Sequence, residues 1–403
     1  MGAYILGVLL FALGIAVTIA LHEWGHLTAA RACGMRVRRY FIGFGPRVWS
    51  FRRGTTEYGL KAVPLGGFCE IAGMTAQDEV TAEEAPHAMV NKPWWQRIIV
   101  LLGGVIMNVL IGFIIIYGVG LSNGLPNPDA DPAPVALETV CAADQLPDGS
   151  LARCSGEGPA AAAGIQPGDR VRVVEGQQIT SFGQVRDIVM AHPGERVSVE
   201  VERNGQPLTL HIDVQSVQRL DADGTLREVG AIGLTGGTGP DAVKKYGPIE
   251  GIGPALRFSG QFFDATVKGL LSLPGKVPGV VASIFGAERA VDSPMSVVGA
   301  SRVGGEMAER SMWTMFWMML ANLNFFLALF NLVPLPPLDG GHIAVVLWEK
   351  LRDGVRRMRG LPALGPADYT RLMPLTMTIA ALLVSLGVVV IVADVVNPVR
   401  LFG

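Results

Sequence analysis

Four apolar stretches constrain this chain more than any other feature of its sequence. They cover Tyr4–Leu21, Ile98–Leu121, Met312–Leu332 and Leu375–Val396, and each is about as long as a helix must be to cross the hydrocarbon core of a bilayer. Half of the residues are hydrophobic and 17% are charged, whereas soluble chains carry about a quarter charged residues. The sequence therefore predicts a polytopic α-helical membrane protein with four transmembrane helices.

The net charge narrows the possible partners, and the start of the first span indicates whether that span is kept. A formal net charge of -2 leaves no basic surplus to neutralise a phosphate backbone, so we expect the lipid bilayer as a partner and no nucleic acid. The first span has no basic segment before it, unlike a secretory signal peptide. We therefore expect it to stay in the mature chain.

Lys and Arg residues concentrate in two of the loops. Residues 31–61 hold eight basic residues and one acidic residue, and residues 349–371 hold six and three. The long segment 122–311 holds 16 basic and 23 acidic residues. Because basic loops stay in the cytoplasm, the sequence predicts that both short loops are cytoplasmic and that the long segment and both termini are extracytoplasmic.

The four cysteines divide between the two predicted sides. Cys33 and Cys69 fall on the cytoplasmic side, where thiols stay reduced, whereas Cys141 and Cys154 fall in the exterior segment. We predict a disulfide between Cys141 and Cys154, and the alternative is two unrelated free thiols.

A soluble module is expected at residues 128–215. Val135–Val140 would be its first strand and Phe182–Ala191 a helix, and two alternating runs around Asn204-Gly205 predict a hairpin. This order resembles an α+β PDZ domain, with an insert carrying the two cysteines. PDZ domains bind extended peptide ends at a sheet edge, but this one could instead be a steric plug over the membrane part.

The rest of the exterior segment, residues 216–311, is expected to hold amphipathic helices at the membrane interface. Pro248–Ile284 is interrupted by Pro274 and Pro278, so we do not expect a fifth span there. The four spans are expected within segments 1–33, 98–121, 312–348 and 374–397. The cytoplasmic loops are expected at 34–97 and 349–373, the soluble module at 128–215, the rest of the exterior segment at 216–311 and a tail at 398–403.

The first span ends in His22-Glu23-Trp24-Gly25-His26. Helix positions i and i+4 share a face, so both imidazoles can reach one Zn2+, and Glu23 is close enough to hold and deprotonate a bound water. Ionisable groups at membrane depth are costly and therefore usually functional. The alternative is a His/Glu cluster that reaches toward the cytoplasmic headgroups.

A third metal ligand is expected far downstream. A catalytic zinc usually has three protein ligands plus water, and Asp339 follows a proline-rich break at the cytoplasmic end of the third span. Both segments end at the same membrane depth, so Asp339 can meet His22 and His26. Asp339 could instead cap the next helix, and His342 is a rival ligand that we rank below it.

These motifs together resemble the site-2 protease family of intramembrane zinc metalloproteases. The resemblance rests on H-E-x-x-H at 22–26, on N-x-x-P-x-P-x-L-D-G at 331–340 and on the PDZ-like insert, and it covers nearly the whole chain. The single PDZ-like module looks most like the actinobacterial type that regulates sigma factors. The resemblance implies one Zn2+ per chain with His22, His26 and Asp339 as ligands, Glu23 as general base and acid, and Asn331 as a substrate-backbone or oxyanion contact.

Two further segments resemble that family. Residues 55–73 look like its re-entrant β-hairpin, in which Gly66 and Gly67 would let a substrate backbone approach an unpaired strand edge. Gly104 and Asn108 fit its G-x-x-x-N pattern. Asn108 could contact substrate, or the pair could simply provide helix packing and one interhelical hydrogen bond.

The resemblance also implies an activity and a place in the cell. It implies cleavage of single-span membrane proteins near the cytoplasmic face of a bacterial cell membrane, with release of a cytoplasmic fragment. The implied substrates are anti-sigma factors already trimmed by a site-1-type protease, and remnant signal peptides. An inactive membrane scaffold and a transporter are weaker alternatives, because the metal motif is intact and no inverted repeat is visible.

Overall fold

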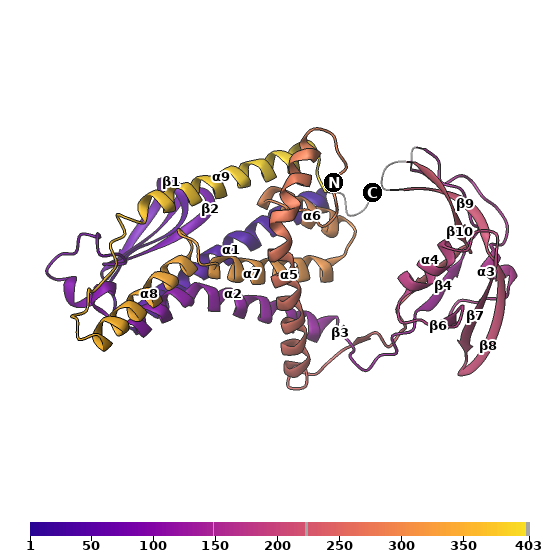
Figure 1. Cartoon of the computed structure of the whole chain (residues 1–403), viewed down its shortest axis with the longest axis horizontal. Helices are drawn as coiled ribbons and strands as arrows, with labels where there is room; N and C mark the ends of the chain where they lie inside the picture. Colours follow the sequence, from indigo (N-terminus) through magenta and orange to yellow (C-terminus); the bar gives the residue numbers. More distant parts are fainter. Residues whose placement is uncertain (148, 222–224, 400–403) are drawn as a thin grey trace. The chain divides into compact units, whose positions relative to one another are not determined.

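The computed structural model describes residues 1–147, 149–221 and 225–399 (Figure 1). It divides into two compact units, one formed by Met1–Asn123 and Tyr246–Gly403 and the other by Gly124–Lys245. Residues 400–403 of the expected tail, 398–403, lie outside the described part of the chain.

Four described helices are long and apolar enough to cross a membrane, namely α1 (Gly2–Ala32), α2 (Trp94–Ser122), α7 (Trp313–Leu332) and α9 (Met373–Val396). This confirms the four spans expected from hydropathy. α1 continues without a break from its apolar stretch through His22 and His26. The two histidines therefore have the fixed spacing and direction of a continuous helix.

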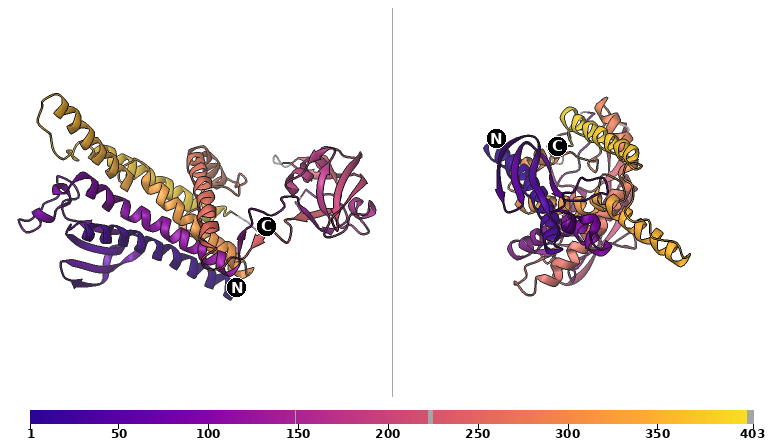
Figure 2. Two further views of the ribbon diagram at one scale, coloured as in Figure 1. Left: turned by 90° about the horizontal axis from the view of Figure 1, so that it is seen from below. Right: turned by 90° about the vertical axis from the view of Figure 1, so that its left-hand side faces the viewer.

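Three of these helices form the centre of the first unit. α1 packs along α2, and α2 along α7 (Figure 2). The α1–α2 crossing uses glycines, because a Cβ added to Gly103 would lie 2.5 Å from the carbonyl oxygen of Gly25. Nearer the N-terminus of α1, the ring of Phe11 meets that of Phe316 edge to face, with ring centroids 5.3 Å apart. Small residues let membrane helices approach closely, and the α1–α2 crossing places the backbone of α2 next to the two histidines.

The sequence predicts that Pro274 and Pro278 interrupt the segment 248–284, but the structure shows one helix there. α5 (Ile252–Ile284) runs through both prolines as one helix. A proline inside a helix removes a hydrogen bond, and packing of α5 against α2, α7 and α9 offsets that loss. α6 (Val297–Glu309) packs against α1, where Gly304 lies on the Phe11 side chain.

The β-hairpin of the first unit is larger than predicted. The sequence places it at 55–73, whereas the structure forms β1 (Val37–Arg53) and β2 (Thr56–Ile71). Residues 39–42 of β1 pair with both 57–60 and 67–70 of β2. The first strand was missed because its arginines and glycines interrupt the alternation of apolar and polar residues that identifies a strand.

A charged network fixes the loop that follows the hairpin, which contains the short helices η1 (Ala85–His87) and η2 (Met89–Asn91). Arg38 donates to Glu84 at 2.8 and 2.9 Å and to Asp78 at 2.9 Å. These hydrogen bonds lower the pKa of Glu84 to about 2. Glu84 is therefore ionised at every physiological pH, and the base of β1 stays tied to the loop.

The second unit contains an antiparallel sheet in the order β11-β4-β5-β7-β8, with β6 paired to β5. Asn204 and Gly205 have positive φ angles of 53° and 77° and join β7 to β8 as a two-residue turn. Valine and isoleucine side chains of the sheet pack under helix α4. The elements are β4 (Val135–Thr139), α3 (Pro159–Ala162), β5 (Arg170–Val174), β6 (Gln177–Gln178), α4 (Phe182–Met190), β7 (Arg196–Arg203), β8 (Gln206–Asp213) and β11 (Leu234–Gly237).

The compact unit extends beyond residue 215, where the sequence predicts the end of the module, as far as Lys245. Two further strands, β9 (Gln215–Leu220) and β10 (Leu226–Ala231), pair with each other, and β11 then adds to β4. β12 (Val243–Lys244) pairs with β3 (Leu125–Pro126), which closes the unit. Because these strands pair with residues far away in the chain, their local sequence gave no domain boundary.

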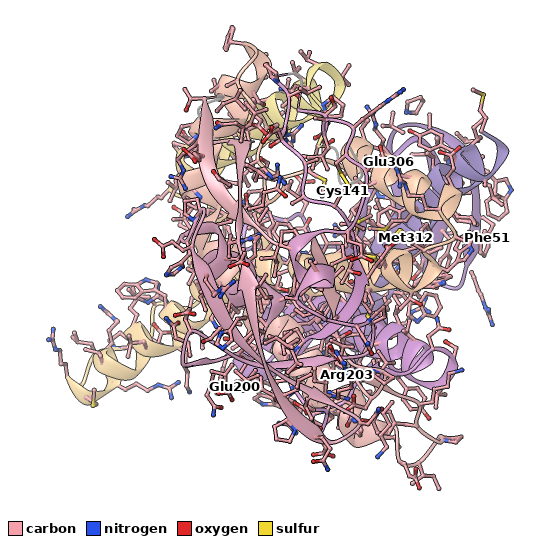
Figure 3. The ribbon with its side chains drawn as sticks, turned by 90° about the vertical axis from the view of Figure 1, so that its right-hand side faces the viewer. Phe51, Cys141, Glu200, Arg203, Glu306 and Met312 are labelled. Carbon is pink, nitrogen blue, oxygen red and sulfur yellow. A yellow bond between two sulfur atoms is a disulfide. The ribbon has the colours of Figure 1, made fainter. Side chains whose placement is uncertain are left out.

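A disulfide joins Cys141 to Cys154 in this unit; Figure 3 labels Cys141. We expect the double variant Cys141→Ser/Cys154→Ser to lose about 2–4 kcal/mol of stability, because the bridge closes a loop between residues 13 apart in sequence. The measurement is thermal unfolding of the full chain in detergent. Cys33→Ser, at a free cysteine, is the matched control, and equal unfolding midpoints for all three proteins would refute the prediction.

Candidate metal centre

Two histidines from one helix form the first half of the site. His22 and His26 lie one turn apart on α1, and both are buried. Their Nε2 atoms are 3.3 Å apart, and their rings meet edge to face with centroids 4.9 Å apart. The helix therefore presents two nitrogen donors that point to one place.

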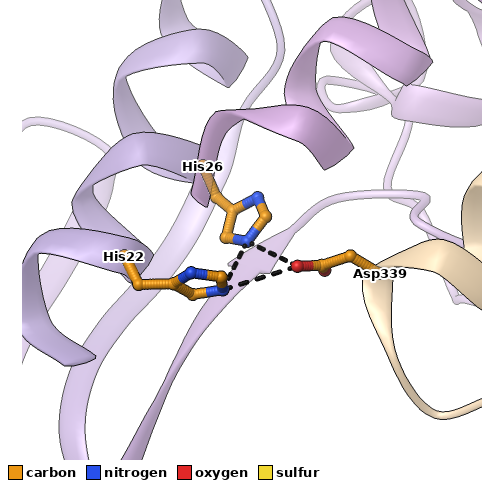
Figure 4. Close-up of side chains that lie close together, drawn as sticks. All are labelled: His22, His26 and Asp339. Atoms are coloured by element: carbon orange, nitrogen blue, oxygen red, sulfur yellow. Dashed lines mark hydrogen bonds and ion pairs between the residues drawn. The ribbon is translucent and has the colours of Figure 1, made fainter. Parts of the chain in front are cut away.

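Asp339 supplies the third donor. α7 ends at Leu332, and the chain turns through a proline-rich segment into α8 (Asp339–Met358). Gly340 lies against the backbone carbonyls of Leu332 and Val333, where a Cβ would have no room, so the start of α8 fits closely under the end of α7. Asp339 Oδ2 lies 3.4 Å from His22 Nε2 and 3.3 Å from His26 Nε2 (Figure 4).

The three donor atoms have the spacing that a tetrahedral zinc site requires. Ligands placed 2.0–2.2 Å from a tetrahedral Zn2+ are about 3.3–3.6 Å from one another, and the three distances here are 3.3, 3.3 and 3.4 Å. Two imidazoles and a carboxylate are also a donor set that zinc accepts. The residues present therefore fit a zinc ion.

Helix α2 forms the wall beside these donors. Gly104 has no side chain there, and an added Cβ would lie 2.5 Å from His26 Nε2 and 2.6 Å from His22 Nε2. Asn108, one turn farther along, is fully buried with its Nδ2 3.2 Å from His22 Nδ1. Both residues of the G-x-x-x-N pattern thus lie at the histidines.

Glu23 and the hairpin meet on the other side of the site. The carboxylate of Glu23 accepts a hydrogen bond from the backbone N–H of Cys69 in β2. Gly67 lies so close that an added Cβ would be 3.0 Å from Glu23 Cγ. Gly66 has a φ angle of 115° and lies against the ring of Phe44. The structure therefore brings the second half of β2 next to Glu23.

Asn331 and His342 lie outside the donor set. Asn331 is in the last turn of α7, and within the described residues it has no hydrogen bond that fixes its amide. His342 stacks on Tyr369, and its Nδ1 lies 3.3 Å from the Tyr369 hydroxyl. Among the described residues, the group that could hold a metal comprises His22, His26 and Asp339.

A buried ion pair near the site was missed from the sequence. Arg97, at the start of α2, donates to Glu349 of α8 at 2.6 Å, and both side chains are less than a tenth exposed. Glu349 also accepts a hydrogen bond from the backbone N–H of Ala367. The pair ties α8, which begins at Asp339, to α2. The available signal was an arginine directly before an apolar span.

Gly104→Ala is expected to weaken metal binding and to keep the helices of the membrane unit in place. The added methyl carbon would lie 2.5 Å from His26 Nε2 and 2.6 Å from His22 Nε2, too close for either ring to keep its position as a metal ligand. We expect a zinc affinity about 10–100-fold weaker, measured by competition with a chelating dye. Gly118→Ala on the same helix, where an added Cβ meets nothing within 4 Å, is the matched control. Unchanged zinc affinity in Gly104→Ala would contradict the site.

The four spans define a multi-pass membrane protein. The Nε2 atoms of His22 and His26 and the Oδ2 atom of Asp339, called the donor triangle below, define a candidate metal site. Comparisons with known proteins agree with both. The family model of peptidase family M50 matches residues 10–362. Zinc metalloprotease Rip1 of Mycolicibacterium smegmatis is 43% identical and aligns over 98% of this chain and 99% of its own. Rip1 of Mycobacterium tuberculosis is also 43% identical, over 99% of each chain.

A more distant relative comes from a plant. The membrane metalloprotease ARASP, chloroplastic, of Arabidopsis thaliana is 30% identical over 84% of this chain and 70% of its own. This chain belongs to peptidase family M50, the site-2 protease family that its motifs resemble.

Proposed function

We propose that this chain, a zinc metalloprotease of family M50, cuts single-span membrane proteins inside the bilayer near its cytoplasmic face. The observation that carries the proposal is the donor triangle of His22, His26 and Asp339, with sides of 3.3–3.4 Å. Relatives named as zinc metalloproteases, aligned over nearly the whole chain, support the same activity.

The residues at and around the donor triangle have separate roles in the proposed hydrolysis. A zinc ion held there would polarise the scissile carbonyl and make a bound water more acidic. Glu23 takes a proton from the attacking water as the new C–O bond forms, and gives it to the amine as the C–N bond breaks. Asn331 is assigned to the substrate backbone or to the oxyanion of the tetrahedral species.

The hairpin is assigned to substrate binding. A peptide bond inside a helix is shielded, so a protease must unwind the helix and hold the segment extended. The close approach of Gly67 to Glu23 supports this role, because a strand added beside residues 67–71 would run past the general base. In the proposal the hairpin is re-entrant. The Phe44 ring lies at Gly66 and Glu23 lies at Gly67, so substrate would pair with the strand edge rather than occupy the space of a missing side chain.

The orientation and the substrates complete the proposal. The basic loops support a cytoplasmic location for the hairpin side, and the Cys141–Cys154 disulfide supports an extracytoplasmic location for the soluble unit and both termini. Substrates are anti-sigma factors trimmed beforehand by a site-1-type protease, and remnant signal peptides. The soluble unit, taken as PDZ-like, acts as a size filter that keeps untrimmed substrates out.

Cleavage in vesicles tests the proposal. The full chain is reconstituted with a single-span substrate that carries either a short or a long exterior part, and the products are mapped by mass spectrometry. We expect a cut within the span near its cytoplasmic end, for the short form only. Cleavage outside the span, or none in a zinc-loaded protein, would overturn the proposed activity.

A deletion tests the size filter separately. Leu125 pairs with Lys244, so residues 128–241 can be replaced by a short Gly/Ser bridge without pulling the membrane unit apart. The deletion variant should still cut the short substrate, which shows that the membrane unit is folded, and should now also cut the long one. Continued rejection of the long substrate would argue against the filter.

A further inference from the structure

One face of α2 lies along both histidines, with Gly104 next to their Nε2 atoms and with Val100 and Asn108 at their Nδ1 atoms. Val100, Gly104 and Asn108 follow one another at four-residue spacing and are all buried, so they lie on one face of the helix. His26 Nδ1 is 2.8 Å from the carbonyl oxygen of Val100. That oxygen can only accept, so His26 carries its proton on Nδ1, and its Nε2 keeps a lone pair for a metal.

Asn108 takes the corresponding place beside His22, with an ambiguity that Val100 lacks. Its amide offers either a donor or an acceptor to His22 Nδ1, because the carboxamide can turn by 180° in nearly the same space. With Nδ2 at 3.2 Å from Nδ1, Asn108 Oδ1 has no hydrogen-bond partner among the described residues. A donating amide puts the imidazole proton on Nε2, which then cannot bind a metal.

We infer that Asn108 is a positioning residue whose Oδ1 accepts the Nδ1–H of His22 and so keeps Nε2 of that histidine as a metal ligand. The inference rests on the proposed function, in which His22 holds zinc. It gives Asn108 a role other than substrate contact, because the side chain is fully buried and lies against the ring nitrogen that faces away from Asp339. Outer-shell acceptors of this kind fix the tautomer of ligand histidines.

Two substitutions separate an accepting amide from a donating one. Asn108→Asp has the same shape and can only accept, whereas Asn108→Leu has a similar volume and can do neither. We expect Asn108→Leu to bind zinc about 10–100-fold more weakly than the unmodified protein. Asn108→Asp should stay within a few-fold of it. The measurement is competition with a chelating dye on the detergent-purified full chain.

Asn324 offers a matched control. It is also fully buried in a membrane helix with an unbonded Oδ1, but its Nδ2 donates to Thr18 and Leu320 rather than meeting a ligand histidine. Asn324→Leu should therefore keep its zinc affinity. An equal loss in Asn324→Leu and Asn108→Leu would show that any buried asparagine has this effect, and would overturn the inference.

A spectroscopic readout follows the ligand itself. Co2+ loaded in place of zinc gives a visible spectrum that depends on its ligand set, so Asn108→Asp should keep the spectrum of the unmodified protein. A folded Asn108→Asp variant with affinity reduced tenfold or more would overturn the accepting role, even if Asn108→Leu failed to fold. Zinc binding by the unmodified protein and by Asp339→Ala separates failure of the proposed zinc site from failure of the role inferred for Asn108. Zinc that does not depend on Asp339 refutes the site itself, whereas Asp339-dependent zinc with full affinity in Asn108→Leu refutes only the role of Asn108.

Discussion

Replacing Glu23 with glutamine is expected to reduce peptide-bond hydrolysis by about 10²–10⁴-fold and to leave zinc binding unchanged. Glutamine has nearly the shape of glutamate but cannot take a proton from water. Glu23 is not among the residues of the donor triangle, so its loss should not release the metal. The measurement combines initial cleavage rates in vesicles with metal content of the same preparations.

Glu83→Gln is the control for the Glu23 substitution. The Glu83 side chain is 87% exposed and meets Arg36 at 3.7 Å, and such exposed pairs contribute little to stability. The Glu83→Gln variant should therefore cleave substrate at the rate of the unmodified protein. Normal cleavage by Glu23→Gln would remove the general base from the mechanism, whereas loss of zinc in that variant would make Glu23 a ligand.

Asp394→Ala is expected to destabilise the membrane unit by about 3–5 kcal/mol. Asp394 lies near the end of α9 and pairs with Arg289 at 2.6 Å, and both side chains are only 1% exposed. Asp394 also accepts hydrogen bonds from the backbone N–H and hydroxyl of Ser296. Removing the carboxylate leaves the guanidinium buried without its charge partner, which is the costly case for a buried ion pair.

Thermal unfolding in detergent tests this effect of Asp394. The control is Asp264→Ala, which removes a pair with Lys268 whose side chains are 65% and 75% exposed. We expect a change below about 1 kcal/mol there. The double variant Arg289→Met/Asp394→Leu should recover much of the lost stability, because it removes both charges. Equal unfolding midpoints for Asp394→Ala and Asp264→Ala would contradict this account of the pair.

The features that sequence predicted best are those encoded by local patterns. The spans follow from runs of apolar residues, and the spacing of His22 and His26 follows from helix periodicity. The Asn204-Gly205 turn follows from its dipeptide. The equal membrane depth at which both motifs end predicts Asp339 as a ligand, and its Oδ2 lies 3.3 and 3.4 Å from the Nε2 atoms of the histidines.

The features that sequence did not predict depend on contacts between distant segments. Arg97 meets Glu349, and Arg289 meets Asp394, but no local pattern couples the partners of either pair. The first hairpin strand was hidden by its arginines, and the soluble unit continues to Lys245 because late strands return to early ones. The motif that contains Asn108 is visible in the sequence, but only the fold shows which atom of His22 it meets.

Metal content of four purified proteins tests the central claim most directly, because that claim is a single zinc site built from two distant motifs. The proteins are the unmodified chain, His22→Ala, Asp339→Ala and His342→Ala, compared at equal fold stability by mass spectrometry of the bound metal. We predict about one zinc per chain in the unmodified protein and in His342→Ala, and none in the other two. Zinc that survives loss of Asp339, or that disappears with His342 instead, would contradict the site described here.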